Sequence, residues 1–179
     1  MSVKVERKLF LEHLKAIKCA VGGKNDKDIL RDIRIFHNTL DPTIIVEATN
    51  LDVAARTKID AHTLNGSETY VVSYKDVVET LKAHKETYVE FKKGEYLYSM
   101  TIYGETWSKT IMGVDPSEFP ECQIMETACM RNPLTGSVSR KEFAKCAKIA
   151  LASISEDVAR FQLLGIYFKF EGSFLALES

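Results

Sequence analysis

One arrangement recurs along this chain and restricts the folds open to it: an amphipathic helix is followed by several strands, and the same order is then repeated. Residues 7–21 carry apolar side chains at every third or fourth position, which is typical of a helix buried on one side. Stretches such as 51–61 alternate between apolar and polar residues, which indicates strands with one buried face. The strands predicted in this way are residues 1–6, 29–36, 43–48, 51–61, 69–72, 88–92, 96–103 and 106–113.

Residue types at the helix ends place two helices in the first part of the chain. Gly22 and Gly23 follow the last turn of the first helix and are expected to end it. Ser73 is the predicted N-cap of the second helix, with Asp76 three residues later. This part of the chain is therefore predicted to contain a β-α-β-β-β unit twice.

The segment 115–120 (Asp-Pro-Ser-Glu-Phe-Pro) interrupts the strand pattern. Prolines at both ends of so short a stretch are typical of a connection between elements. We therefore predict a linker here that separates two domains, residues 1–120 and residues 121–179.

A third unit begins in the second domain. Ser139 is expected to cap a third helix, and two strands are predicted at 161–170 and 173–177. The unit thus reaches Ser179 without its last strand. The predicted fold class is α+β, with repeated β-α-β-β-β units whose helices lie on one face of antiparallel sheets, and such repeats are typical of stacked or ring-shaped assemblies.

The charge balance bears on which partners the chain can bind. It has 24 basic and 25 acidic residues and a formal net charge of -1. This balance argues against nucleic-acid binding by the whole surface but allows one basic face. No segment reaches the run of about 20 apolar residues that a membrane span needs, and the first residues lack the apolar core of a signal peptide. The four cysteines have no CxxC spacing, which favours reduced thiols and a cytoplasmic location.

The residue types of known catalytic and metal sites are scattered. The turn Gly22-Gly23-Lys24 follows a helix rather than a strand, unlike a phosphate-binding P-loop. Cys146 is expected to be a small buried side chain of the third helix rather than a nucleophile. We therefore predict no enzyme, no metal and no cofactor. None of the histidines has metal-ligand spacing: His13, His37, His62 and His84.

Several short motifs follow one another along nearly the whole chain. They are Leu11-x-x-Leu14 with Gly22-Gly23-Lys24 and Ile29-Leu30, then Thr49-Asn50-Leu51-Asp52, then Asp115-Pro116-Ser117-Glu118-Phe119-Pro120, and finally Arg160 with Leu163-Leu164-Gly165. In this order and spacing they resemble the motifs of the bacterial DNA polymerase III beta subunit, the sliding clamp of the replicative polymerase.

The resemblance implies the DNA-clamp fold: three similar domains per chain, and two chains closed head to tail around duplex DNA. Helices line the hole of such a ring, and sheets form its outside. It also implies a noncatalytic processivity factor whose partners are double-stranded DNA, a DNA polymerase, a clamp loader and a second copy in a homodimer. This chain would correspond to the first domain and about half of the second, so the family's third domain and part of its peptide pocket would lie after Ser179.

Basic residues are the candidate DNA contacts. Lys24 stands where the family carries a basic residue that points into the hole, and a cation on a turn reaches phosphate without reading bases. For Lys24, and for each of the helix residues listed next, the alternative is an ordinary solvated side chain. A diffuse basic lining would come from the polar faces of the three helices: Lys15, Lys75, Lys82, Arg140, Lys141 and Lys145.

Two further candidate surfaces follow from the resemblance. Arg160 and Leu163 match one wall of the family's partner-peptide pocket, the alternative being a surface arginine and a core leucine. Trp107 and Ile111 share a face of the last strand of the first domain, which pairs with another subunit in the family. Lys109 lies on the same face, and the alternative for Trp107 is a half-buried sheet residue. A second functional hypothesis is therefore a truncated clamp-like interaction module that pairs through this edge without forming a ring.

Overall fold

The structure, a computed structural model, describes residues 2–37, 42–66, 68–121, 137–155, 165–171 and 174–178. The chain divides into a first unit, Met1–Thr127, and a second unit, Ala128–Ser179. The described residues do not test the domain boundary predicted after residue 120, which stays a prediction.

The first unit contains the repeat expected from the sequence. Its first half is β1 (Ser2–Glu6), α1 (Arg7–Ile17), the 3-10 turns η1 (Lys18–Ala20) and η2 (Asp28–Arg31), β2 (Asp32–His37), β3 (Thr43–Thr49), β4 (Ala54–Asp60) and β5 (Thr63–Asn65). Its second half is β6 (Thr69–Ser73), α2 (Tyr74–Ala83), β7 (Tyr88–Lys93), β8 (Met100–Tyr103), β9 (Ser108–Ile111), β10 (Gly113–Val114) and the 3-10 turn η3 (Pro116–Glu118). The β-α-β-β-β order is thus confirmed in both halves, and each half adds a short fifth strand, β5 or β10.

The two halves exchange their first strands. One sheet has the order β5-β1-β7-β8-β9 and the other β10-β6-β2-β3-β4, so β1 joins the strands of the second half and β6 joins those of the first. All the pairings are antiparallel. Neither half can therefore complete its sheet alone, and the exchange makes one core out of two repeats.

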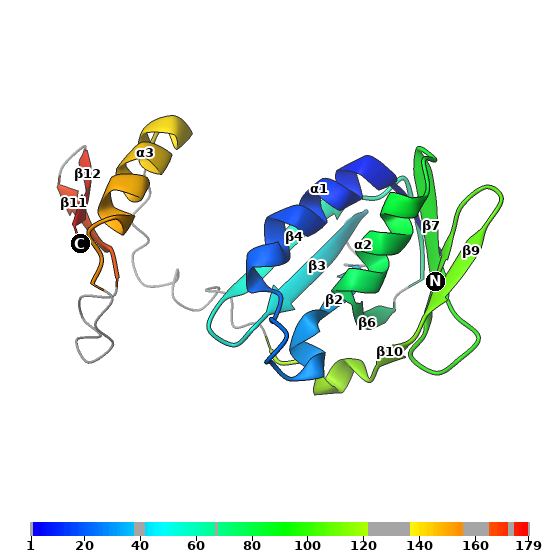
Figure 1. Cartoon of the computed structure of the whole chain (residues 1–179). Helices are drawn as coiled ribbons and strands as arrows, with labels where there is room; N and C mark the ends of the chain where they lie inside the picture. The colour runs from blue at the N-terminus through cyan, green and yellow to red at the C-terminus, as the bar shows by residue number, and fades with distance from the viewer. Residues whose placement is uncertain are drawn as a thin grey trace. The chain divides into compact units, whose positions relative to one another are not determined.

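Helices α1 and α2 lie side by side over the sheets (Figure 1). Phe10 and Leu14 of α1 and Val77 and Leu81 of α2 are fully buried in the common core. Burying one such side chain stabilises the fold by about 2 kcal/mol. The observed α+β architecture, with helices on one face of antiparallel sheets, is the predicted one.

The polar ends of the helices also connect the two halves. The hydroxyl of Ser73 accepts a hydrogen bond from the backbone N–H of Asp76 at 3.2 Å, so the predicted cap of α2 is confirmed. At the other end of α2, buried Arg7 donates from Nη1 to the carbonyl of Leu81 at 3.0 Å and from Nε to the carbonyl of Glu86 at 2.7 Å. A cation at a helix C-terminus satisfies carbonyls that have no partner within the helix.

Several predicted element ends were wrong. The first helix becomes a 3-10 turn after Ile17, before the glycines are reached. Residues 29–31 lie in η2 rather than in a strand, and residues 63–65, where no strand was predicted, form β5. Residues 51–53 and 96–99 are turns, since Leu51 and Tyr98 have φ angles of 77° and 59°, which no strand allows.

The predicted linker is packed against the first unit instead of connecting two units freely. Asp115 caps η3 by accepting a hydrogen bond from the backbone N–H of Ser117 at 2.9 Å. Phe119 is buried beside Val71, and the guanidinium of Arg34 lies 5.4 Å from the centre of its ring. Phe119, near the end of the predicted linker, thus forms a small second hydrophobic cluster with Val71.

The second unit contains α3 (Arg140–Leu151) and a hairpin of β11 (Tyr167–Glu171) and β12 (Phe174–Glu178). Ser139 precedes the helix as predicted, but its hydroxyl makes no capping hydrogen bond. Ala150 is buried, whereas Leu151 is 58% exposed. Residues 161–164 of the predicted strand lie outside the described residues.

Candidate nucleic-acid interface

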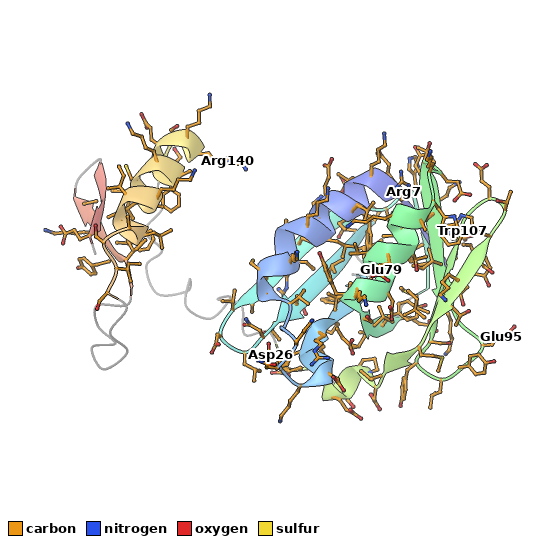
Figure 2. The ribbon with its side chains drawn as sticks, in the orientation of Figure 1. Arg7, Asp26, Glu79, Glu95, Trp107 and Arg140 are labelled. Atoms are coloured by element: carbon orange, nitrogen blue, oxygen red, sulfur yellow. The ribbon has the colours of Figure 1, made fainter. Side chains whose placement is uncertain are left out.

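Lys24 lies in the turn that joins η1 to η2, two residues before Asp26, which Figure 2 labels, and its side chain is exposed. The turn is closed at its base by the backbone N–H of Gly22, which donates to the carbonyl of Leu30 at 2.7 Å. A Cβ on Gly22 would lie 2.9 Å from that carbonyl oxygen, so this approach requires glycine. The turn therefore holds a cation at a defined point beyond the end of α1.

The outer faces of α1 and α2 carry fewer unpaired cations than the sequence suggested. Lys15 and Lys82 are exposed, as predicted. Lys75 is also exposed, but its Nζ lies 3.9 Å from the carboxylate of Glu79 one turn later. With Asp76 beside them, the acidic groups of α2 balance its two lysines. Acidic groups therefore offset the cations of α2, whereas α1 keeps exposed Lys8 and Lys15 against the single acidic residue Glu12.

The most basic described helix is α3. Arg140, Lys141 and Lys145 are all exposed on it, and Arg140 is labelled in Figure 2. Lys148 is a fourth exposed cation in its last turn, against the single acidic residue Glu142. Lys148 was not predicted as a contact, although its spacing of three from Lys145 on a polar helix face was the signal that marks it.

An apolar groove runs between α3 and β12. Its walls include Phe143, Ile149, Leu175 and Leu177. Cys146 also lines the groove and is exposed, so the expectation of a buried thiol was wrong. Among the described residues β12 packs against α3, and Phe143, Ile149 and Leu151 of the helix are exposed beside it.

The edge of the first sheet bears on the predicted subunit interface. Among the described strands β9 pairs with β8 alone, so its other side is a free edge. Ile111 is buried in the core, 3% exposed, and contributes no side chain to that edge. Trp107 is half-buried immediately before β9, and its Nε1 donates to a carboxylate oxygen of Glu86 at 2.5 Å. Trp107 and the backbone of β9 are therefore the parts of the predicted interface that lie at this edge. Their pairing with a second subunit stays a prediction.

Beside Trp107 a shallow groove separates α2 from β9. Its lining includes the acidic residues Asp76 and Glu79 of the helix and Lys109 of the strand. Lys109 therefore lies on the helix side of β9, as its alternation with Ile111 predicted. The predicted peptide-pocket residues Arg160 and Leu163 lie outside the described residues.

Titratable groups with displaced pKa values are spread through the first unit. Burial, reinforced by nearby Asp28 and Asp76, raises the pKa of Asp32 to about 6. Burial and the hydrogen bond to Glu68 raise the pKa of Tyr70. Neither group shares a described cavity with a nucleophile. Within the described ranges no three histidine, cysteine, aspartate or glutamate side chains are placed to hold a metal ion, and no helix there is long and apolar enough to cross a membrane.

Comparison with solved structures decides the fold. The beta subunit of DNA polymerase from Streptococcus pyogenes matches with a TM-score of 0.83 and 17% identity over 96% of this chain and 44% of its own. DNA polymerase III subunit beta from Pseudomonas aeruginosa matches with a TM-score of 0.80 and 12% identity over 98% of this chain and 45% of its own. The chain has the fold of a bacterial sliding clamp.

The clamp fold extends over both units. The beta subunit of Thermotoga maritima matches with a TM-score of 0.76 and 17% identity over 98% of this chain and 46% of its own. The chain thus spans a little less than half the length of the clamps it matches. No family model matches the sequence, and no curated protein matches it significantly, so the similarity lies in the three-dimensional structure.

Proposed function

We propose that this chain is a DNA polymerase processivity factor of the sliding-clamp type, which helps to encircle duplex DNA and tether a polymerase to it. The observation that carries the proposal is the clamp fold, which extends over nearly the whole chain and includes the helices on which the basic residues lie. The proposed DNA contacts are Lys24, Lys15, Lys75, Lys82, Arg140, Lys141 and Lys145, together with Lys148.

The chemistry of these residues suits a protein that moves along DNA. Lysine and arginine contact phosphates, which are alike at every base pair, so the bound protein keeps its register on the backbone without recognising sequence. Each phosphate contact releases counterions and steepens the salt dependence of binding by about 0.9 in the log-log slope. The balanced charge of α2 favours weak contacts, which permit sliding.

The remaining parts of the proposal concern partners. The Helicobacter pylori beta clamp, which this chain matches with a TM-score of 0.74 at 15% identity, has been solved with a DNA ligase peptide bound. We propose that a polymerase and a clamp loader bind this chain in the cytoplasm through Arg160 and Leu163, and that a second copy pairs along β9 beside Trp107. The chain itself is proposed to catalyse no reaction.

The test compares cations on the helices with cations on the sheets. Lys4 and Lys58 are exposed on strands, on the opposite face from Val3, Val5 and Ile59 of the core. We expect the double variant Lys145→Ala/Lys148→Ala to weaken binding to a duplex oligonucleotide at low salt and to lower the log-log slope by about 2. The control Lys4→Ala/Lys58→Ala has the same charge change and should bind like the parent chain. Equal losses in the two double variants would contradict the proposed orientation.

A second candidate function is supported by the free edge of β9. A clamp-like interaction module would pair through this edge and would need no DNA at all. It predicts that both double variants behave like the parent chain towards DNA, while changes at the β9 edge weaken association with a partner.

A further inference from the structure

The guanidinium of Arg31 is bound to the turn that carries Lys24. Its Nε donates to the carbonyl of Gly23 at 2.9 Å, and its Nη2 donates to the carbonyls of Lys24 and Asp26, the latter at 3.0 Å. Three carbonyls from the apex of one turn thus converge on one side chain. Arg31 has no role predicted from the sequence, because an arginine seven residues after a lysine has no local pattern that marks it.

Other contacts fix the opposite side of the same turn. The backbone N–H of Gly23 donates to Oδ2 of Asp26 at 2.6 Å, and the backbone N–H of Asp26 donates to the carbonyl of Gly23 at 3.3 Å. Nη1 of Arg31 lies 3.1 Å from the carboxylate of Asp28 in η2. The guanidinium therefore connects the turn to the helical turn that follows it, while the Lys24 side chain is left exposed.

We propose that Arg31 is a positioning residue for DNA binding: it holds the backbone at Lys24 so that the ammonium group is presented to the phosphate backbone. This inference rests on the proposed function and adds to it a residue that acts through another. Arg31 donates to the three carbonyls from two nitrogens of one rigid plane, Nε and Nη2. A lysine at the same position keeps the charge but has a single nitrogen at the end of a flexible chain, so it loses this geometry. Fixing the turn beforehand lowers the entropy that Lys24 loses when it binds.

The test uses the full chain, a short duplex oligonucleotide and the salt dependence of binding. The variants are Lys24→Ala, Arg31→Lys and the double variant, with Lys58→Arg as the charge-conserving control. Lys24→Ala should lower the log-log slope by about 1. Arg31→Lys should lower the slope by most of that amount although the net charge is unchanged, and adding it to Lys24→Ala should cause no further loss. Lys58→Arg should bind like the parent chain, because Lys58 is exposed on β4 and is not one of the proposed DNA contacts.

The results separate the two claims. If Lys24→Ala leaves binding unchanged, the proposed DNA contact is wrong. If Lys24→Ala weakens binding while Arg31→Lys has no effect, the contact stands and the positioning role is wrong. Additive losses in the double variant would mean that Arg31 contacts DNA by itself, which also overturns positioning. A merely less stable protein would lower the bound fraction at every salt concentration without changing the slope.

A charge-matched pair at Asp26 keeps the inference testable if Arg31→Lys folds poorly. Asp26→Asn keeps an oxygen that can accept from the N–H of Gly23, whereas Asp26→Ala removes it. Both variants lose the same negative charge, so simple electrostatics predicts equal affinity. We expect Asp26→Ala to bind DNA severalfold more weakly than Asp26→Asn, and equal affinities would overturn the idea that the shape of the turn matters.

Discussion

The imidazole of His84 stacks on the indole of Trp107, with 3.6 Å between the ring centres and an angle of 8° between the planes. His84 is the C-cap of α2, and Trp107 precedes β9. The contact therefore joins the end of a helix to the free edge of a sheet, next to the hydrogen bond from Trp107 to Glu86. This edge is the surface proposed for pairing with a second copy.

Replacing His84 by alanine should expose Trp107. Since Trp107 is the only tryptophan in the chain, its emission reports this site alone. We expect a shift of the emission to longer wavelength and a loss of about 1 kcal/mol in the free energy of unfolding, the usual value of an aromatic pair. His62→Ala is the matched control, because His62 contacts Tyr88 instead. An unchanged spectrum in His84→Ala would contradict the stacked arrangement.

A second prediction concerns the carboxylate of Glu47, which is fully buried on β3. Arg34 and Arg56, from the strands on either side, both form ion pairs with it. Removing one partner of a buried ion pair leaves the others without compensation. Glu47→Gln should lower the free energy of unfolding by about 3 kcal/mol in urea denaturation. Glu79→Gln, which removes an exposed partner of Lys75, should lower the free energy of unfolding by less than about 1 kcal/mol. Similar losses in the two variants would mean that Glu47 is accessible to solvent.

The pKa of Asp32 makes stability depend on pH. Burial first, and the neighbouring Asp28 and Asp76 next, raise it from 3.8 to about 6 in the folded chain. The folded state therefore holds a proton that the unfolded state has lost, and stability falls as the pH rises through the interval between these values. Above a pH of about 6 the carboxylate of Asp32 is ionised in the folded chain, and the full loss of stability is present.

Asp32→Asn should remove that penalty. At pH 7 we expect the variant to be more stable than the parent chain by on the order of 2 kcal/mol, with the difference shrinking as the pH falls towards 4. Thermal denaturation across this range measures it. Asp60→Asn changes an exposed carboxylate and should give no such trend. A parent chain that gains stability from pH 4 to 7 relative to Asp32→Asn would reverse the predicted sign.

Local signals in the sequence predicted local structure. The spacing of Phe10, Leu14 and Ile17 identified the buried side of α1, and the Ser73 cap formed as expected. Alternation at Leu51 and Val53 wrongly predicted a strand, because both residues are exposed in a turn. In that turn the backbone N–H of Val53 donates a hydrogen bond to the side-chain oxygen of Asn50. Alternation does not encode which strand pairs with which, so the exchange of β1 and β6 between the halves was not predicted.

The candidate site was predicted in part, for the same physical reason. Lys24, Lys15 and Lys145 were identified because exposed cations on helices and turns have a sequence pattern, and the structure exposes all three. Ile111 was assigned to an edge because alternation places a residue on a face without saying whether that face is covered. Arg31 was missed because its contacts with the turn depend on the folded path of the backbone.

The central claim is that this chain belongs to an assembly that encloses DNA, and topology tests it most directly. The chain would be loaded on a nicked circular DNA, and the mass retained on the circle would be measured by size-exclusion chromatography with light scattering before and after the circle is cut. We predict that protein stays on the closed circle at a salt concentration that abolishes binding to short duplexes, and that it is released when the DNA is made linear. Equal retention on circular and linear DNA, or no retention on either, would contradict the account.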